Sequence, residues 1–378
     1  MELQEKIRSA ILDIKDDLVK TSLAIHSHPE LAFNEFQASK LLGDKLSSFG
    51  FNVERGFCDL ETAFKATIGN GSLTVAICAE YDALPAIGHA CGHNIIASSA
   101  IGAAYGLKSV INDIGVKVII IGTPAEEGGG GKILLMQRGG FDGVDAAMMV
   151  HPAPIDAITL PCKALEQFDV HFIGKSSHAS AAPHLGINAL DAQIISQVSI
   201  GLLRQHLNYY DQVHGIITKG GDAANIIPEH TVSTYYIRSK SLKGLETLRP
   251  KVVAAFQGAA VATGATLNIV PCGPTYSELI SDERLVECYM KASQELGRPI
   301  TREVPESLSA STDMGNVSLS IPSIHPLVGI ESNGSTLHQS EFANMCVGES
   351  ADNAIIHGAT AMALTTLYYS EMIRDDKR

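Results

Sequence analysis

Three short apolar runs, each ending in residue types that bind metals, constrain this chain more than any other feature. The runs 73–79, 116–121 and 144–150 have the composition of buried strands. They are followed by Glu80, Asp82, His89, Cys91 and His93, by Glu126 and Glu127, and by His151. Open α/β sheets place their ligands at the carboxyl ends of strands, and chance seldom puts ligand types at three successive strand ends. A thiolate and imidazoles within five residues suit a borderline-soft ion such as zinc.

Each segment also has a simpler explanation. On this alternative interpretation, residues 80–94 are a loop with one buried thiol and two surface histidines. Glu126 and Glu127 then belong to a solvated acidic turn. A phosphate-binding loop is excluded at residues 126–132, because the pattern would have to begin at Glu126, and Ile133 rather than Ser or Thr follows Lys132.

The order of elements predicts a layered α/β domain. Amphipathic spacing predicts helices over 3–26 and 36–48, and small apolar residues predict another over 94–110. The β-like runs 63–68 and 73–79 flank a Gly-Asn-Gly-Ser turn, which favours a hairpin. The strand–helix–strand order that follows favours a largely parallel central sheet with helices on its faces.

Residues 165–274 have a different character. Strands are expected over 167–173, 213–219, 231–238 and 265–270, and helices over 187–206 and 242–262. This βαββαβ order predicts an inserted ferredoxin-like α+β domain. The first domain then comprises 1–164 and 275–378, with helices over 282–296 and 347–372 and β runs at 321–330.

Composition limits the partners. A chain of 378 residues favours two domains, and its net charge of −13 argues against nucleic acid or an anionic membrane surface. No apolar run reaches about 18 residues, so no membrane span is expected. Seven scattered cysteines and the lack of a signal-peptide pattern favour the cytoplasm.

The motifs together carry a family resemblance. They are Tyr-Asp-Ala-Leu-Pro at 81–85, His-Ala-Cys-Gly-His-Asn at 89–94, Thr-Pro-Ala-Glu-Glu at 123–127, His-Pro at 151–152, Gly-Lys-x-Ser-His-Ala at 174–179, Asn-Ile-Ile-Pro at 225–228 and Ser-Thr-Asp-x-Gly-Asn-Val-Ser at 311–318. In this order they resemble the M20 family of metal-dependent amidohydrolases and peptidases. The branch that they resemble most contains aminobenzoyl-glutamate hydrolase and M20-domain-containing protein 2.

The resemblance implies a pair of divalent ions per subunit, zinc or manganese, with Glu126 as general base. The implied ligands are Cys91, His93, Glu127, His151 and His338. By itself, His338 reads as an ordinary surface histidine. Asp82 matches the aspartate that orients the site, and His89 is not expected to bind an ion. Many relatives have a histidine ligand where this chain has Glu80.

The resemblance also implies a homodimer formed through the inserted domain, which acts as a lid. His178, Asn225 and Arg238 match positions that bind substrate, and His178 would reach the partner's active site. The alternative is that the three residues are structural: His178 caps a loop, Asn225 occupies a turn and Arg238 is a charge at a strand edge.

The expected reaction is hydrolysis of an amide bond in a small dipeptide or N-acyl amino acid, with an aminobenzoyl-glutamate-like compound among the possible substrates. A metal activates water, and Glu126 takes its proton and passes it to the leaving amine. The alternatives are an aminoacylase for other N-acyl amino acids and a catalytically silent metal-binding protein. A serine hydrolase is disfavoured because no Gly-x-Ser-x-Gly elbow is present.

Overall fold

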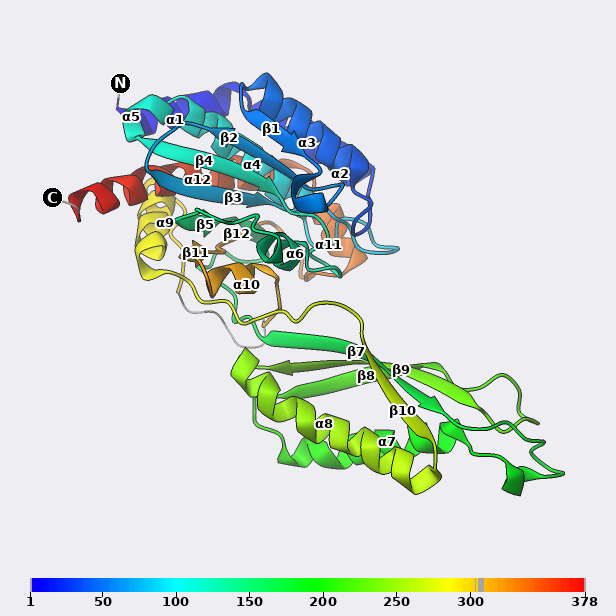
Figure 1. The fold of residues 1–378 in the computed structure, drawn as a ribbon. Helices are drawn as coiled ribbons and strands as arrows, with labels where there is room; N and C mark the ends of the chain where they lie inside the picture. The colour runs from blue at the N-terminus through cyan, green and yellow to red at the C-terminus, as the bar shows by residue number, and fades with distance from the viewer. Residues whose placement is uncertain (1, 303, 305–308, 377–378) are drawn as a thin grey trace. The chain divides into compact units, whose positions relative to one another are not determined.

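The computed structural model describes residues 2–302, 304 and 309–376 and divides the chain into two compact units (Figure 1). The first unit comprises Met1–Pro161 and Leu279–Arg378, and the second comprises Cys162–Glu278. The second unit is therefore an insertion within the first.

The first unit is built on a six-stranded sheet in the order β1-β2-β4-β3-β5-β11. These strands are β1 (Asn52–Arg55), β2 (Phe64–Ile68), β3 (Leu73–Ala79), β4 (Val116–Gly122), β5 (Ala146–Met148) and β11 (Ser323–Ile324). The pairs β3–β4, β3–β5 and β5–β11 are parallel, while β1–β2 and β2–β4 are antiparallel. This confirms the largely parallel central sheet.

Both faces of this sheet are buried, and successive residues of a strand contribute to opposite faces. In β3, Val75 and Ile77 join one hydrophobic cluster, while Ala76 and Cys78 join another on the opposite face. The first cluster is covered by α1 (Leu3–Asp13), α2 (Lys15–Ser27), α3 (Phe36–Ser48), α4 (His93–Lys108), α9 (Glu283–Glu295) and α12 (Glu349–Asp375). The second is covered by α6 (Gly131–Gln137) and α10 (Met314–Ser318). The unit is a three-layer α/β structure because a sheet that is apolar on both faces must be covered on both.

The prediction of a hairpin between residues 63–68 and 73–79 is wrong. Strand β4 lies between β2 and β3 and pairs with both. The Gly69–Ser72 connection therefore steps over the start of β4. A β-carbon added at Gly71 would lie 1.8 Å from the Gly115 carbonyl oxygen. The sequence does predict the connection at residues 69–72. It does not predict that β4 lies between the two strands and pairs with each of them.

The helix expected over residues 3–26 is interrupted. It divides into α1 and α2 at Ile14, where φ is −108° and ψ is 12°. Ile7, Ile11 and Leu18 are nevertheless all fully buried, so the apolar stripe that predicted the helix continues across the break.

The remaining elements of the first unit are short. They are η1 (Phe57–Asp59), α5 (Ile111–Ile114), α11 (Ser340–Met345) and a separate parallel pair, β6 (His151–Ala153) with β12 (Leu327–Gly329). Although α12 spans 27 residues, no helix in the described ranges is long and apolar enough to cross a membrane.

The second unit has the predicted ferredoxin-like order. Its elements are β7 (Ala164–Ile173), η2 (Pro183–Leu185), α7 (Ala189–Leu203), η3 (Arg204–His206), β8 (Gln212–Lys219), β9 (His230–Ser239), α8 (Leu242–Thr263) and β10 (Thr266–Pro271). The antiparallel sheet has the order β10-β7-β9-β8, and α7 and α8 share a hydrophobic core with it. Buried and partly exposed residues alternate along β9, because one face of the sheet packs against the helices and the other does not.

Candidate metal centre

The carboxyl ends of β3 and β4 bring acidic residues together. The two strands are parallel, and Ala79 is in register with Gly122, so the segments that follow them leave the sheet side by side. The Glu127 N–H donates to Asp82 Oδ2 at 3.0 Å, which ties the two segments to each other. The sheet register thus determines which strand-end residues meet.

Cys91 lies at the centre of the donor atoms. Its Sγ is 3.4 Å from His151 Nε2 and 3.6 Å from His338 Nε2. Two groups of potential ligand atoms, each lying within 4.8 Å of one another, share this cysteine. The first group is Cys91, His93 and His151, and the second is Cys91, Glu127 and His338. All five residues expected to be ligands therefore converge on one place.

The spacing of these atoms suits a metal ion. Nitrogen, oxygen and sulfur ligands at zinc-like bond lengths in a tetrahedron lie about 3.3–3.6 Å apart. The two distances from Cys91 fall in this range, as does the 3.3 Å from His338 Nε2 to Glu127 Oε2.

Buried atoms without hydrogen bonds point to the same place. His93 Nε2, Glu127 Oε1 and Glu80 Oε2 are buried and have no hydrogen-bond partner within the described ranges. His93 Nε2 is 3.4 Å from Glu80 Oε2 and 3.8 Å from Glu127 Oε1. Burying unpaired polar atoms is costly, and a cation bound among them would supply the missing interaction.

The far side of each imidazole ring is held by an acceptor. His93 Nδ1 is 3.1 Å from Asp82 Oδ1, and His151 Nδ1 donates to the Pro152 carbonyl at 2.7 Å. These contacts direct both Nε2 atoms towards Cys91 and fix the tautomer of His151. Ligating histidines in metal sites are oriented in this way.

The electrostatics favour positive charge at this place. Burial opposes protonation of His93, but Asp82, Glu80 and Glu127 outweigh it and raise the pKa of the ring well above its ordinary value. Burial, followed by the charges of Glu80 and Glu127, raises the pKa of Glu126 well above its ordinary value. Glu126 is therefore suited to holding a proton.

Two loops beside the donor atoms each contain a non-glycine residue in the left-handed backbone conformation. His338 has φ of 66°, and its N–H donates to the Ala90 carbonyl at 3.0 Å. Ala125, just before Glu126, has φ of 59°, and its N–H donates to Glu35 Oε1 at 2.9 Å. Non-glycine residues in this region are strained and are often found at functional sites.

Sequence reasoning missed three buried charged residues beside these donors. Glu35 anchors Ala125, and Lys132 and Asp313 form a cluster with Glu80. A single lysine between four glycines and an apolar run was the available signal for Lys132. His89 belongs to none of the three candidate metal groups in the described chain.

The three expected substrate-binding residues all lie in the second unit. His178 and Asn225 are on adjoining loops. The Ala179 N–H donates to the Asn225 carbonyl at 3.0 Å, and the backbones of His178 and Ile226 pair in an isolated antiparallel β-bridge. His178 Nδ1 accepts from the Ala181 N–H at 3.2 Å. Arg238 lies on β9, paired with Leu165 and Gln212.

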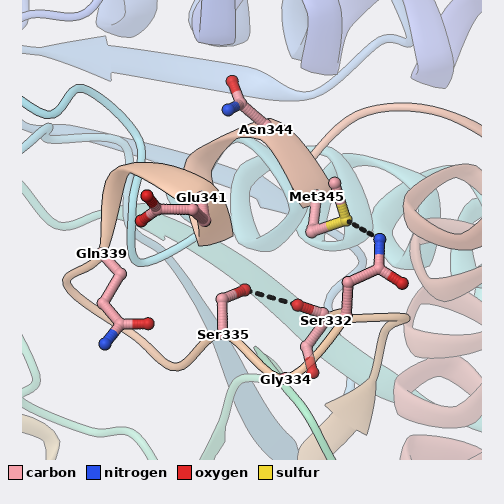
Figure 2. A pocket seen from close by; sticks show the side chains of 8 residues that line it. Ser332, Gly334, Ser335, Gln339, Glu341, Asn344 and Met345 are labelled. Atoms are coloured by element: carbon pink, nitrogen blue, oxygen red, sulfur yellow. Dashed lines mark hydrogen bonds between the residues drawn. The ribbon is translucent and has the colours of Figure 1, made fainter.

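The loop that carries His338 also lines a pocket of about 450 Å³. Figure 2 shows that the Ser335 hydroxyl donates to the Ser332 carbonyl. The Asn333 amide donates to the Met345 sulfur. The lining residues are Ser332, Asn333, Gly334, Ser335, Gln339, Glu341, Asn344 and Met345. Glu341 is the only charged residue among them.

The first unit is a three-layer α/β structure that carries, at its strand ends, donor groups able to hold the metal ions that metal-dependent hydrolases use to activate water. The model of Peptidase family M20/M25/M40 matches residues 76–365. The chain belongs to this family.

Relatives and solved structures agree with this assignment. Xaa-Arg dipeptidase of Mus musculus is 37% identical, over 97% of this chain and 88% of its own length. A p-aminobenzoyl-glutamate hydrolase subunit of Escherichia coli (strain K12) is 33% identical, over 65% of this chain and 55% of its own length. A putative aminohydrolase from methicillin-resistant Staphylococcus aureus has the same fold, with a TM-score of 0.79 at 21% identity and coverage of 97% and 99%.

Proposed function

We propose that this protein is a dipeptidase that uses two divalent ions, zinc or manganese, and prefers a basic C-terminal residue in its substrate. The observation that carries the metal assignment is the pair of donor groups that share Cys91. Cys91, His93 and His151 would hold one ion, and Cys91, Glu127 and His338 would hold the other, because Cys91 belongs to both groups.

Bound ions supply Lewis acidity, which makes a water molecule more acidic and polarises the substrate carbonyl. Glu126 lies beside the donor atoms, with Oε2 4.0 Å from His93 Nε2. As general base it takes the proton of the attacking water and gives it to the leaving amine nitrogen.

Three observations support a basic dipeptide. The relative that is 37% identical over nearly the whole chain is an Xaa-Arg dipeptidase. The net charge of −13 attracts cationic substrates. The pocket lined by residues on either side of His338 in the sequence contains one charged side chain, the carboxylate of Glu341. A p-aminobenzoyl-glutamate-like substrate is the second candidate, because the Escherichia coli relative carries that name.

An activity panel tests this function. The protein is loaded with Zn²⁺ or Mn²⁺ and given Xaa-Arg, Xaa-Lys and neutral dipeptides, p-aminobenzoyl-glutamate and N-acyl amino acids. We expect the highest kcat/KM for the basic dipeptides, and a larger rise in KM for them than for neutral dipeptides in Glu341→Gln. Higher kcat/KM for p-aminobenzoyl-glutamate or an acyl amino acid would overturn the substrate class, and no cleavage by fully loaded protein would overturn the enzyme assignment.

We further propose that the second unit is the dimerisation domain. Its helix α7 exposes Ile194, Val198 and Leu202 by 52%, 59% and 70% on one face. Strand β8 is an edge of the sheet and exposes Ile216 by 67%. A second copy of this chain would cover the apolar face and extend the edge strand.

The native mass of the Val198→Asp/Leu202→Asp variant tests the dimer. We expect a monomer for this variant and a dimer for wild type. Val261→Asp, at an exposed valine on the other helix, α8, is the control. A dimer that survives the double substitution would place the interface elsewhere.

The compartment proposed is the cytoplasm. All seven cysteines lie in the described ranges and none of them forms a disulfide, as expected for a reducing compartment. Localisation of a tagged protein in its own cell tests this assignment.

A further inference from the structure

A buried ion cluster lies immediately behind the metal centre. Lys132, the second residue of α6, is fully buried. Its Nζ donates to Glu80 Oε1 at 2.5 Å and to Asp313 Oδ1 at 2.6 Å. Its backbone N–H donates to Asp313 Oδ2 at 2.9 Å. Lys132 and Asp313 therefore hold each other in a fixed arrangement.

The lysine contacts only one oxygen of Glu80. The other, Oε2, is buried and has no hydrogen-bond partner within the described ranges. It lies 3.4 Å from His93 Nε2, which also lacks a hydrogen bond. A carboxylate buried with one oxygen unsatisfied is costly, and a neighbouring ion is a common reason for such an arrangement.

The geometry around Glu80 is that of a ligand. The 3.4 Å from Oε2 to His93 Nε2 matches the separation of about 3.3 Å between oxygen and nitrogen ligands of one tetrahedral ion. Glu80, His93 and Glu126 form a third group whose ligand atoms all lie within 4.8 Å of one another. Both strand ends thus aim donors at His93, the first residue of α4.

We propose that Glu80 Oε2 is a further ligand of the ion that His93 holds, and that Lys132 and Asp313 are positioning residues for Glu80. This inference rests on the proposed function, because it requires that His93 holds an ion. The lysine binds one carboxylate oxygen and leaves the other for the ion. A hard oxygen ligand beside the thiolate and imidazoles of this group would also strengthen binding of a harder ion such as Mn²⁺ relative to Zn²⁺.

Ion binding by the Glu80→Gln variant tests this proposal. The amide keeps the side-chain volume, and its oxygen still accepts from Lys132, but it is a poorer ligand. Metal-free protein is titrated with Zn²⁺ and with Mn²⁺ in a calorimeter, and bound ions are counted by mass spectrometry after gel filtration. We expect one of the two ions to bind at least about 10–100-fold more weakly, with a larger loss for Mn²⁺.

Asp156→Asn is the matched control. Asp156 is an ion-paired carboxylate of the same unit, but both of its oxygens contact Arg298 Nη2, at 2.9 and 2.8 Å, and it is not in a candidate metal group. We expect it to retain both ions. If Glu80→Gln fails to fold, Glu80→Asp is used, because it keeps the charge beside Lys132 and withdraws the oxygen by one methylene.

Substitution with Co²⁺ separates a ligand from a merely structural group. Its visible spectrum depends on the number and type of ligands, so loss of a ligand should change the spectrum of Glu80→Gln, while Asp156→Asn should match wild type. Ion affinities within twofold of wild type together with an unchanged spectrum would overturn the proposal. If wild type itself binds no ion at Cys91, His93 and His151, the metal centre proposed above fails instead.

Discussion

At the scale of single residues, Glu126 and Glu127 are adjacent but face different partners. Glu127 Oε2 is 3.3 Å from His338 Nε2 and belongs to a group that contains Cys91, whereas Glu126 Oε2 is 4.0 Å from His93 Nε2 and belongs to neither group that contains Cys91. Glu126→Gln should retain both ions and lose at least about 10²–10⁴-fold in kcat, because it removes the base and keeps the volume. Steady-state kinetics and ion counts on the same sample measure this. Near-normal kcat with both ions bound would show that another group is the base.

The shared position of Cys91 makes a second prediction. Cys91→Ser should weaken both ions, since a hydroxyl is harder and far less acidic than a thiol. Glu127→Gln should weaken only one, because Glu127 belongs to a single cysteine-containing group. Calorimetric titration of the two metal-free variants with Zn²⁺ compares them directly. Equal loss of the two ions in both variants would contradict the bridging role of Cys91.

Glu35 makes the stability of the metal-free protein depend on pH. Burial, followed by the charge of Asp82, raises the pKa of its carboxyl from 4.5 to about 7. Because the folded pKa lies above the unfolded one, the stability contributed is complete below about pH 4.5 and is lost as pH rises through about 7. The loss is on the order of 3 kcal/mol.

Urea unfolding of metal-free wild type and Glu35→Gln between pH 4.5 and 8 measures this contribution. The difference in unfolding free energy between the two proteins should shift in favour of the variant as pH rises. A constant difference across this range would mean that Glu35 titrates normally.

At the scale of elements, the sheet order depends on close backbone approach at Gly71. A β-carbon there would meet the carbonyl of Gly115, just before β4, and backbone atoms cannot move aside as a side chain can. Gly71→Ala should lower the free energy of unfolding by about 1–3 kcal/mol, as overpacking does. In α8, nothing lies within 4 Å of a β-carbon at Gly258, so Gly258→Ala should be neutral or stabilising. Thermal unfolding of the two variants gives the comparison, and equal stability would show that the turn relaxes freely.

At the scale of the whole molecule, the proposed dimer predicts complementation between subunits. Glu126→Gln and His178→Ala should each be inactive as homodimers. If His178 serves the partner's active site, a mixed dimer contains one site with both residues intact. Mixing the two under conditions of subunit exchange should then restore part of the activity. Demonstrated exchange without recovered activity would restrict His178 to its own subunit or exclude it from the reaction.

The sequence by itself determined the kinds of element and the chemistry available at their ends. Apolar runs of strand length, small-residue helices and the βαββαβ order are local patterns, and each appears in the structure near its predicted range. Ligand types after β3, after β4 and at His151 could be recognised for the same reason, because parallel strands deliver their carboxyl ends to one edge. Cys91, His93, Glu127, His151 and His338 do converge.

Tertiary structure decided what depends on contacts between distant segments. The insertion of β4 between β2 and β3 replaced the expected hairpin, because strand pairing is chosen by the buried sheet and not by the turn. Lys132 meets Asp313 across 181 residues and Glu80 across 52. The glycines before Lys132 and the apolar run after it mark the position as unusual, but they do not show which carboxylates the lysine meets. It can be buried only because two carboxylates arrive from other strands and loops, and the low dielectric of the core makes that pairing obligatory.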